Sequence, residues 1–145
     1  MDVETGTAVP RSAVSVAIVL RGHTLVQDKP QASGGKDEGP MASELLLAGL
    51  LACQHSTFVK VAAKRKVEAT IRDLKGELDF VDGEIVGIRV KFHLTAPPAT
   101  ADQALETLLK LTDRTCTISR VLKVPVAATY SRSTAGAPAA KASST

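Results

Sequence analysis

The chain has 145 residues, 44% of them hydrophobic, so it is large enough for one globular domain and too apolar for wholesale disorder. Only 3% of the residues are aromatic and none is Trp, which disfavours a nucleic-acid groove built on stacked rings. The net charge is +3, and two of these charges (Arg132 and Lys141) lie in the tail, so the chain lacks a large basic face and we expect no nucleic-acid partner.

The first forty residues predict an arm, two strands and a loop. Residues 1–12 show no hydrophobic periodicity and are expected to form a loose arm. Val14–Leu20 and His23–Asp28 are rich in strand-forming residues, and Arg21-Gly22 is the turn between them. Gln31–Pro40 is dense in turn-forming residues and is expected to be a loop.

The segment Met41–Lys66 predicts a long helix. It has no internal proline and is almost uniformly apolar over Leu45–Cys53, and a helix that is apolar all round is expected to be buried. That run is far shorter than the about 20 residues that cross a bilayer, and the polar, acidic start of the chain is unlike a signal peptide. We therefore expect a cytoplasmic protein with no membrane partner and with free thiols.

Two strands and a second helix are predicted next. Val67–Phe80 alternates between apolar and polar residues but changes phase at Arg72-Asp73, which indicates a β-bulge. Asp82-Gly83 predicts a hairpin turn into a second strand with regular alternation. Thr100 is expected to cap the following helix, with Gln103 reaching back to complete a capping box.

The C-terminal part predicts a last strand over Val124–Tyr130 and a disordered, low-complexity tail over residues 131–145. The predicted order is two strands, a long helix, two strands, a helix and a strand, which indicates the α+β class. The hairpins favour antiparallel pairing. We therefore expect a single domain over residues 1–130.

The two cysteines, Cys53 and Cys116, are too few for a disulfide framework or, by themselves, for a four-ligand zinc site. An inert core thiol is the simpler interpretation of Cys53, which lies in the buried helix. Cys116 lies between Arg114 and Arg120, whose charges would favour a thiolate, so local chemistry makes it the better reactive candidate. As a pair they can form a functional disulfide if their Cα atoms lie about 4.4–6.8 Å apart.

The three histidines do not indicate a metal site. His55 lies about 200° around the helix from Cys53, so the two cannot bind one ion. His93 shares a strand face with two basic side chains and is expected to be exposed, and His23 opens a strand without an evident partner. The spacings typical of metal ligands and phosphate-binding loops are lacking, so we expect neither a metal nor a cofactor.

Four sequence blocks resemble the OsmC/Ohr family, which is named after osmotically inducible protein C and organic hydroperoxide resistance protein. They occur in the family's order and are GHTLVQDKP (Gly22–Pro30), GGKDEGP (Gly34–Pro40), ELLLAGLLAC (Glu44–Cys53) and CTISRVL (Cys116–Leu122). The resemblance runs from about residue 14 to residue 130, and the first two blocks are most similar to the OsmC-like subgroup. It implies an intertwined homodimer in which antiparallel sheets wrap around a long buried central helix and a second helix.

The resemblance also implies a thiol-dependent peroxidase that reduces organic hydroperoxides in defence against oxidative and osmotic stress. Cys53 matches the family's peroxide-attacking cysteine and Cys116 its resolving cysteine. The thiolate of Cys53 would become a sulfenic acid, Cys116 would condense with it to a disulfide, and a dithiol reductant would restore both thiols.

The sequence departs from the strict family members at the groups that activate the thiolate. Those members have a carboxylate ten residues before the first cysteine, paired with an arginine that contacts the thiolate. Here Ser43 occupies that position, and Glu44 lies nine residues before Cys53, on the opposite helix face and about 13 Å away. Glu44 can therefore act only across a dimer, or as a helix-start residue favoured by the helix dipole. Arg21 is the nearest match to the arginine by position.

These departures keep a second function open, which belongs to a different class. The fold can serve as a non-catalytic small-molecule binding or redox-sensing module whose apolar pocket no longer turns over peroxide. An experiment that detects sulfenic acid at Cys53 under mild peroxide separates the two hypotheses.

Overall fold

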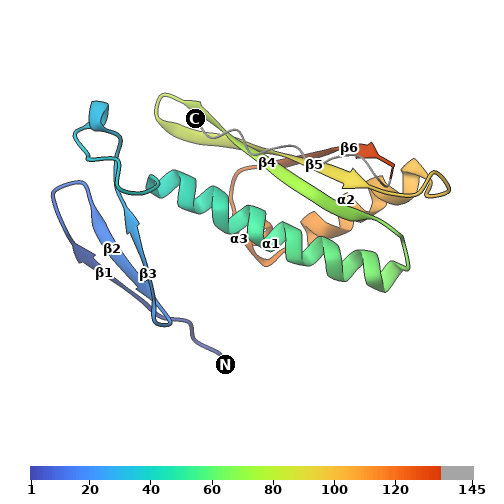
Figure 1. Cartoon of the computed structure of the whole chain (residues 1–145), viewed down its shortest axis with the longest axis horizontal. Helices are drawn as coiled ribbons and strands as arrows, with labels where there is room; N and C mark the ends of the chain where they lie inside the picture. The colour runs from blue at the N-terminus through green and yellow to red at the C-terminus, as the bar shows by residue number, and fades with distance from the viewer. Residues whose placement is uncertain (135–145) are drawn as a thin grey trace. The chain divides into compact units, whose positions relative to one another are not determined.

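A computed structural model describes residues 1–134, and its element order is shown in Figure 1. The elements are β1 (Gly6–Pro10), β2 (Val16–Leu20), β3 (His23–Gln27), the short 3₁₀ helix η1 (Gln31–Ser33), α1 (Ala42–Arg65), β4 (Thr70–Val81), β5 (Glu84–Thr95), α2 (Asp102–Thr115), α3 (Thr117–Val121) and β6 (Val126–Ser133).

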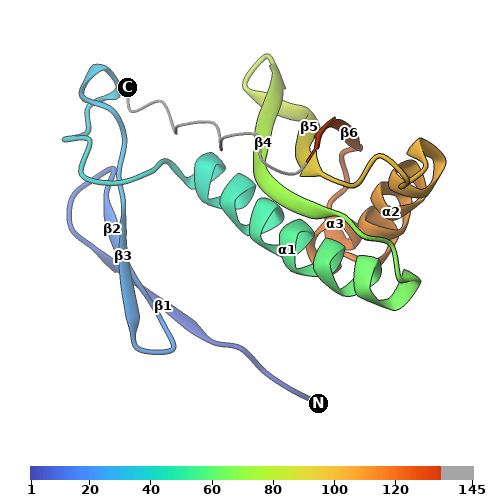
Figure 2. The same cartoon turned by 45° about the vertical axis from the view of Figure 1, so that its right-hand side comes forward.

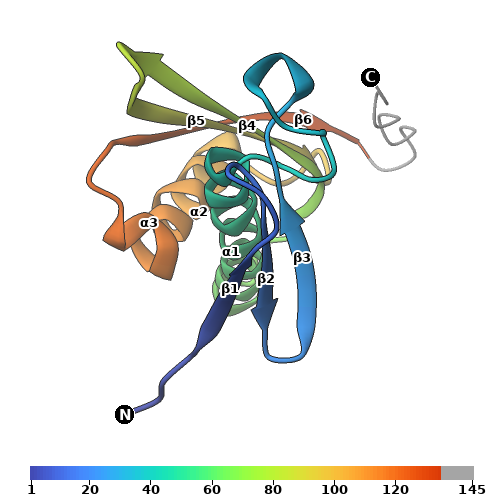
Figure 3. The same ribbon diagram turned by 90° about the vertical axis from the view of Figure 1, so that its left-hand side faces the viewer.

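The chain divides into two compact units, one over Met1–Leu46 and one that begins at Leu47. The first unit contains the antiparallel sheet β1–β2–β3, whose strands are visible in Figure 3. The prediction of a loose arm over residues 1–12 was wrong for Gly6–Pro10, which pairs along β2. All five residues of β1 are exposed, so this strand has no hydrophobic alternation from which it could be predicted.

The loop after β3 is held by hydrogen bonds to a buried carboxylate. Asp28 is 1% exposed and accepts hydrogen bonds from the backbone N–H groups of Lys29 at 2.8 Å, Lys36 at 3.0 Å and Glu38 at 3.2 Å. The bond from Lys29 contributes most to lowering the pKa of Asp28, and those from Glu38 and Lys36 add to it against the opposing effect of burial. This side chain therefore ties three backbone positions of the predicted loop together, and backbone hydrogen bonds such as that from Asp28 to the Pro40 carbonyl at 3.2 Å add to it.

The second unit is built on the sheet β4–β5–β6, and α1, α2 and α3 lie beside this sheet in Figure 2. The predicted hairpin is confirmed, because Asp82 and Gly83 have φ angles of 49° and 82° in the turn from β4 to β5. The predicted bulge is confirmed by a register shift between Ile71 and Asp73. The expectation of antiparallel pairing holds for β4 and β5 but is wrong for β6, which runs parallel to β5. A crossover through α2 and α3 precedes β6, and such a crossover permits parallel pairing where a hairpin does not.

The core of the second unit lies on one face of β5. Four alternate β5 side chains, each 1% exposed, pack with fully buried leucines of α1 and α2. Phe58 of α1 meets Phe92 of β5 with their ring centroids 5.7 Å apart. The β5 residues are Ile88, Val90, Phe92 and Leu94, and the leucines are Leu50, Leu105 and Leu108.

The long predicted helix is confirmed as α1, with each end shifted by one residue. The expectation that it is buried all round was wrong for the single chain, because Leu46 is 37% and Val59 52% exposed. By length and composition alone α1 is also long and apolar enough to cross a membrane, a property that core helices of soluble proteins share. Its buried residues are Leu50, Gln54, Thr57, Phe58 and Ala62.

Two predicted boundaries in the C-terminal half were wrong. Helix α2 begins at Asp102 without a side-chain cap, and the Thr100 hydroxyl donates instead to the Glu68 carbonyl at 3.1 Å. Strand β6 continues to Ser133, and Arg132 within it donates to Asp102 at 2.8 Å. The rest of the predicted tail, residues 135–145, lies outside the described residues, and the single domain stays a prediction.

Candidate active site

The structure brings Cys53 and Cys116 together. Cys53 lies in the middle of α1, Cys116 lies at the junction of α2 and α3, and the Cys116 Sγ donates a hydrogen bond to the Cys53 Sγ at 2.9 Å. Both cysteines are free thiols, Cys53 partly exposed and Cys116 0% exposed. The sulfurs are therefore close enough to form a disulfide bond of about 2.05 Å after a small displacement.

The two thiols have opposite pKa shifts. Burial raises the pKa of Cys53, but hydrogen bonds from Cys116, from the backbone of Ile118, from Thr57 and from the backbone of Thr117 together bring it below its usual value. Burial is also the main reason that the pKa of Cys116 is raised, and its bond to Cys53 adds to this. Cys53 is thus the thiol that ionises first, and Cys116 is its neutral donor.

The expectation that Arg114 and Arg120 make Cys116 the more reactive thiol was wrong. Both arginines are exposed, and the pKa of Cys116 is governed by burial and by Cys53. The groups that favour a thiolate at Cys53 are instead the Cys116 thiol, the Thr57 hydroxyl and the first backbone N–H groups of α3. Sequence reasoning missed these N–H groups because Thr117–Val121 is only one turn of helix, too short to show periodicity.

Cys116 is itself the N-cap of α3, and its sulfur accepts from the backbone N–H of Ser119 at 3.5 Å. Two α1 side chains flank the thiols. Thr57 lies one turn after Cys53, with its Oγ1 at 4.0 Å from the Cys53 Sγ. Gln54 is fully buried and donates from Nε2 to the Ser119 Oγ at 3.2 Å.

Glu44 lies in the first turn of α1, where its Oε2 accepts from the backbone N–H of Met41 at 2.7 Å. This is the reach-back bond of a capping box, so the structure gives Glu44 the helix-start role. Arg21 lies in the β2–β3 turn of the first unit, is exposed, and has a φ of 49°. The catalytic roles assigned to Glu44 and Arg21 by the family resemblance stay predictions.

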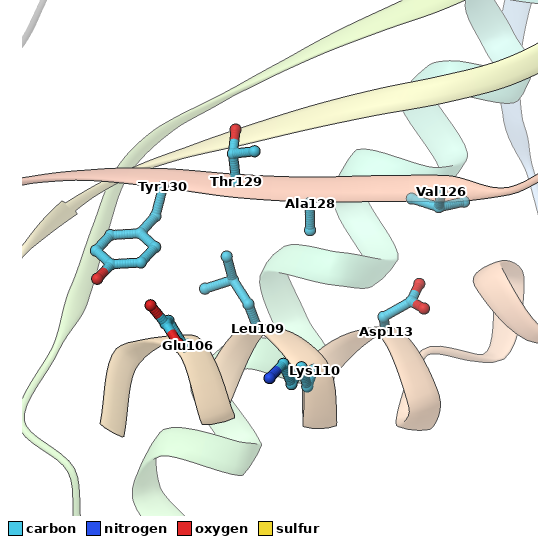
Figure 4. Close-up of a pocket in the computed structure, with 8 residues that line it drawn as sticks. All are labelled: Glu106, Leu109, Lys110, Asp113, Val126, Ala128, Thr129 and Tyr130. Atoms are coloured by element: carbon cyan, nitrogen blue, oxygen red, sulfur yellow. The ribbon is translucent and has the colours of Figure 1, made fainter. Parts of the chain in front are cut away.

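A pocket of about 420 Å³ lies between α2 and β6, and neither thiol lines it. Leu109 points from α2 toward β6, with Glu106 and Tyr130 at one end of the pocket and Asp113 at the other (Figure 4). Burial raises the pKa of the Tyr130 hydroxyl, and the carboxylates of Asp102 and Glu106 add to the effect. This hollow and the thiol pair are separate features of the second unit.

His93 contacts Asp73 through Nδ1 and is 20% exposed, so the expectation of an exposed histidine was wrong. Asp73 of β4 and His93 of β5 are paired across the two strands. The sequence does not show this pairing, because the bulge between Ile71 and Asp73 shifts the register of the strands. Within residues 1–134, no three His, Cys, Asp or Glu side chains gather as metal ligands would. The expectation of no metal and no cofactor stays a prediction.

Comparison with known proteins gives a family and a fold. The model of the OsmC family, described as OsmC-like protein, matches residues 35–131. An OsmC-like protein from Mycoplasma pneumoniae is 14% identical, with a TM-score of 0.72 over 90% of this chain and 97% of that chain. An OsmC-like protein of unknown function from Vibrio cholerae is also 14% identical, with a TM-score of 0.72 over 90% of this chain and 99% of that chain.

An organic hydroperoxide resistance protein from Elizabethkingia anophelis is 20% identical, with a TM-score of 0.65 over 92% of this chain and 98% of that chain. No curated protein sequence matches the chain. At these identities the structural matches establish a shared fold. The predicted α+β class with an OsmC-like fold is thereby confirmed, and the structure shows two three-stranded sheets and a long helix.

Proposed function

Since the chain belongs to the OsmC-like protein family, we propose that it is a thiol-dependent peroxidase that reduces organic hydroperoxides through Cys53. The observation that carries the proposal is the contact of 2.9 Å between the Sγ atoms of Cys53 and Cys116, in which one thiol has a lowered pKa and the other donates to it. The organic hydroperoxide resistance proteins among the structural neighbours support the same chemistry.

The reaction follows from the order in which the two thiols ionise. The Cys53 thiolate attacks the terminal oxygen of the hydroperoxide, the O–O bond breaks, and the leaving alkoxide takes a proton to become an alcohol. Cys53 is left as a sulfenic acid, two electrons more oxidised. Cys116 then attacks the Cys53 sulfur, the S–O bond breaks, and water leaves as the disulfide forms. A dithiol reductant restores both thiols by thiol–disulfide exchange.

The exposed apolar surface supports the homodimer that completes this proposal. Among residues 1–46 the only buried side chains are polar, those of Ser15 and Asp28, so the first unit has no hydrophobic core of its own. In α1 the small residues Ala48 and Ala52 lie on the exposed side with Val59. A second copy can cover both surfaces, and burying apolar area stabilises such an assembly. Sedimentation equilibrium tests it, and a monomer at micromolar concentration contradicts it.

In such a dimer Glu44 and Arg21 are the candidates for the carboxylate and the cation that act on the thiolate of Cys53. A cytoplasmic location fits the same mechanism, because reductants there keep cysteines as thiols and regenerate them after oxidation. Organic peroxides that accumulate during oxidative or osmotic stress would be the substrates.

Steady-state reduction of cumene hydroperoxide with dithiothreitol as the dithiol tests the proposal. We expect turnover by the natural chain and none by Cys53→Ser, while Ala63→Ser, an exposed substitution on the same helix, serves as the matched control. The variant Cys116→Ser should consume peroxide and accumulate a sulfenic acid that dimedone traps. Equal turnover by the natural chain and Cys53→Ser would contradict the assignment of Cys53 as the cysteine that attacks the peroxide.

The alternative is a non-catalytic binding or redox-sensing module, and one observation favours it. The pocket between α2 and β6 has an apolar floor of Leu109, Val126 and Ala128 and does not include the thiols. If this pocket is the functional site, an apolar ligand should bind equally well to the natural chain and to Cys53→Ser. In that case the natural chain would form no sulfenic acid under mild peroxide.

A further inference from the structure

Gln54, which follows Cys53 on α1, is a buried polar side chain that the peroxidase chemistry leaves unused. It is 0% exposed, its Nε2 donates to the Ser119 Oγ at 3.2 Å, and its Oε1 has no hydrogen-bond partner among the described residues. A buried amide that is only half satisfied stabilises a fold less than an apolar side chain of similar size. Stability alone therefore does not explain a glutamine here.

The bond to Ser119 connects Gln54 to the thiols through a chain of donors. A serine hydroxyl that accepts from an amide keeps its own proton to donate elsewhere. Ser119 lies against Cys116, because its backbone N–H donates to the Cys116 Sγ at 3.5 Å. Burial and the bond to Cys53 raise the pKa of Cys116, while the backbone and the side chain of Ser119 both lower it. Cys116 in turn donates to Cys53 at 2.9 Å. The hydrogen bonds therefore run in one direction, from α1 through α3 and back to α1.

We propose that Gln54 is a positioning residue for the resolving step: its amide fixes the direction of the Ser119 hydroxyl, and this hydroxyl holds the Cys116 sulfur as the attacking group beside Cys53. The inference rests on the proposed peroxidase function, because it assigns Gln54 to the reaction of Cys116 with an oxidised Cys53. If the Gln54 amide were flipped, its Oε1 would face Ser119 and accept the proton of the Ser119 hydroxyl, which could then no longer donate to Cys116.

The step that Gln54 assists is the condensation of the two cysteines. The Cys116 sulfur loses its proton and attacks the Cys53 sulfenic acid, an S–S bond forms and the S–O bond breaks. The departing hydroxide takes up a proton and leaves as water. A donor hydrogen bond from Ser119 favours the thiolate of Cys116, the form that attacks, so loss of this bond slows the step.

A double-mutant cycle between Gln54→Leu and Ser119→Ala tests the proposal. After one equivalent of cumene hydroperoxide, the sulfenic acid of Cys53 divides between disulfide formation and trapping by dimedone, and mass spectrometry measures both products. We expect each single variant to slow disulfide formation about three- to tenfold, which corresponds to the loss of one hydrogen bond. The double variant should be no slower than either single one, because Gln54 acts through Ser119.

A purely structural role for Gln54 would give a different pattern. It would lower the thermal midpoint, leave the ratio of disulfide to dimedone adduct unchanged, and add to the effect of Ser119→Ala. Either an unchanged ratio or additive effects overturns the proposal. Gln103→Leu, which replaces an exposed glutamine on α2, is the matched control and should leave the ratio unchanged. Should Gln54→Leu not fold, Gln54→Glu replaces it in the cycle, because a carboxylate accepts the Ser119 proton and turns it away from Cys116.

A second measurement separates failure of this inference from failure of the peroxidase function. The equilibrium between the dithiol and the Cys53–Cys116 disulfide in glutathione buffers needs no peroxide. We expect Gln54→Leu and Ser119→Ala to shift this equilibrium constant by the same factor, with no further shift in the double variant. If the natural chain forms no sulfenic acid with peroxide, the peroxidase function is contradicted. If Gln54→Leu and Ser119→Ala shift the dithiol–disulfide equilibrium constant by independent factors that multiply in the double variant, the positioning role is contradicted.

Discussion

Thr117→Pro removes one of the hydrogen-bond donors that hold the pKa of Cys53 below its usual value, and the backbone tolerates the change. Thr117 is the first residue of α3, where proline is well accommodated, and Cys116 before it has φ −61° and ψ 119°, the extended conformation that residues preceding proline adopt. The side chain of Thr117 is exposed. The substitution therefore deletes the N–H group and leaves the helix start intact.

The expected magnitude follows from the place of this donor among the four that favour the thiolate. The backbone bond from Thr117 contributes least, after those from Cys116, Ile118 and Thr57. We therefore take the lower part of the range for a hydrogen bond, about 0.5–1 kcal/mol, which is roughly a two- to fivefold loss of thiolate at neutral pH. The pKa of Cys53 rises accordingly.

The assay is the pH dependence of alkylation of Cys53 by iodoacetamide, with the adduct identified by mass spectrometry. In the natural chain we expect the inflection below the usual pKa of a cysteine, and in Thr117→Pro a displacement toward higher pH. Thr117→Ala keeps the N–H group and is the control. If the profiles of Thr117→Pro and Thr117→Ala superimpose while both proteins are folded, the amide of Thr117 does not stabilise the thiolate.

Three further predictions concern the fold around the site. In Gly39→Ala the new Cβ would lie 2.0 Å from a backbone oxygen of β3, so we expect a loss of about 1–3 kcal/mol in urea unfolding, whereas Gly49→Ala, with open space around it, should gain up to about 1 kcal/mol. Because the pKa of Asp28 is lowered in the folded state, its contribution to stability is present above pH about 4 and is lost as the pH falls through the folded-state pKa. Asp28→Asn should remove this pH dependence of unfolding. It should also speed hydrogen exchange of the Glu38 amide at neutral pH. Glu44→Gln should leave the free energy of unfolding unchanged within about 0.5 kcal/mol, because glutamine keeps the capping acceptor. A fall in its peroxidase rate would therefore reveal a catalytic carboxylate. Glu44→Ala should lower the free energy of unfolding by about 0.5–2 kcal/mol.

The parts of the fold that could be predicted are those with a strong local signal. The long apolar run, the phase change at Arg72-Asp73 and the turn at Asp82-Gly83 each determined an element to within a residue or two. Strand β1 could not be predicted, because its exposed residues pair by backbone hydrogen bonds alone and carry no hydrophobic pattern. The parallel pairing of β6 was equally hidden, since strand order depends on how α2 and α3 return the chain to the sheet.

For the candidate site, the family resemblance identified the two cysteines, but the groups that set their pKa values are not readable from spacing. Local sequence placed cations beside Cys116 and suggested that it ionises first, while the structure shows it buried and acting as a donor to Cys53. Besides Cys53, its partners are Ser119 and a backbone amide of the same one-turn helix, and Ser119 is in turn bound by Gln54, 65 positions away in the chain. Contacts of this kind depend on tertiary packing, which hydrophobic periodicity does not encode.

The source of thiolate stabilisation decides what can replace a missing cation. An arginine acts through its charge, so its effect weakens as salt is added, whereas backbone N–H groups at hydrogen-bond distance act over a short range and are little screened. In this chain the described donors to Cys53 are a thiol, a hydroxyl and two amides of α3, all from the second unit. A lowered pKa of Cys53 therefore needs no contribution from Arg21. If Arg21 acts in the dimer as a second source, Arg21→Gln should lower the alkylation rate strongly at low ionic strength and weakly at high, and Thr117→Pro should lower it equally at both. Equal salt dependence of the two variants would contradict this division between charge and hydrogen bonding.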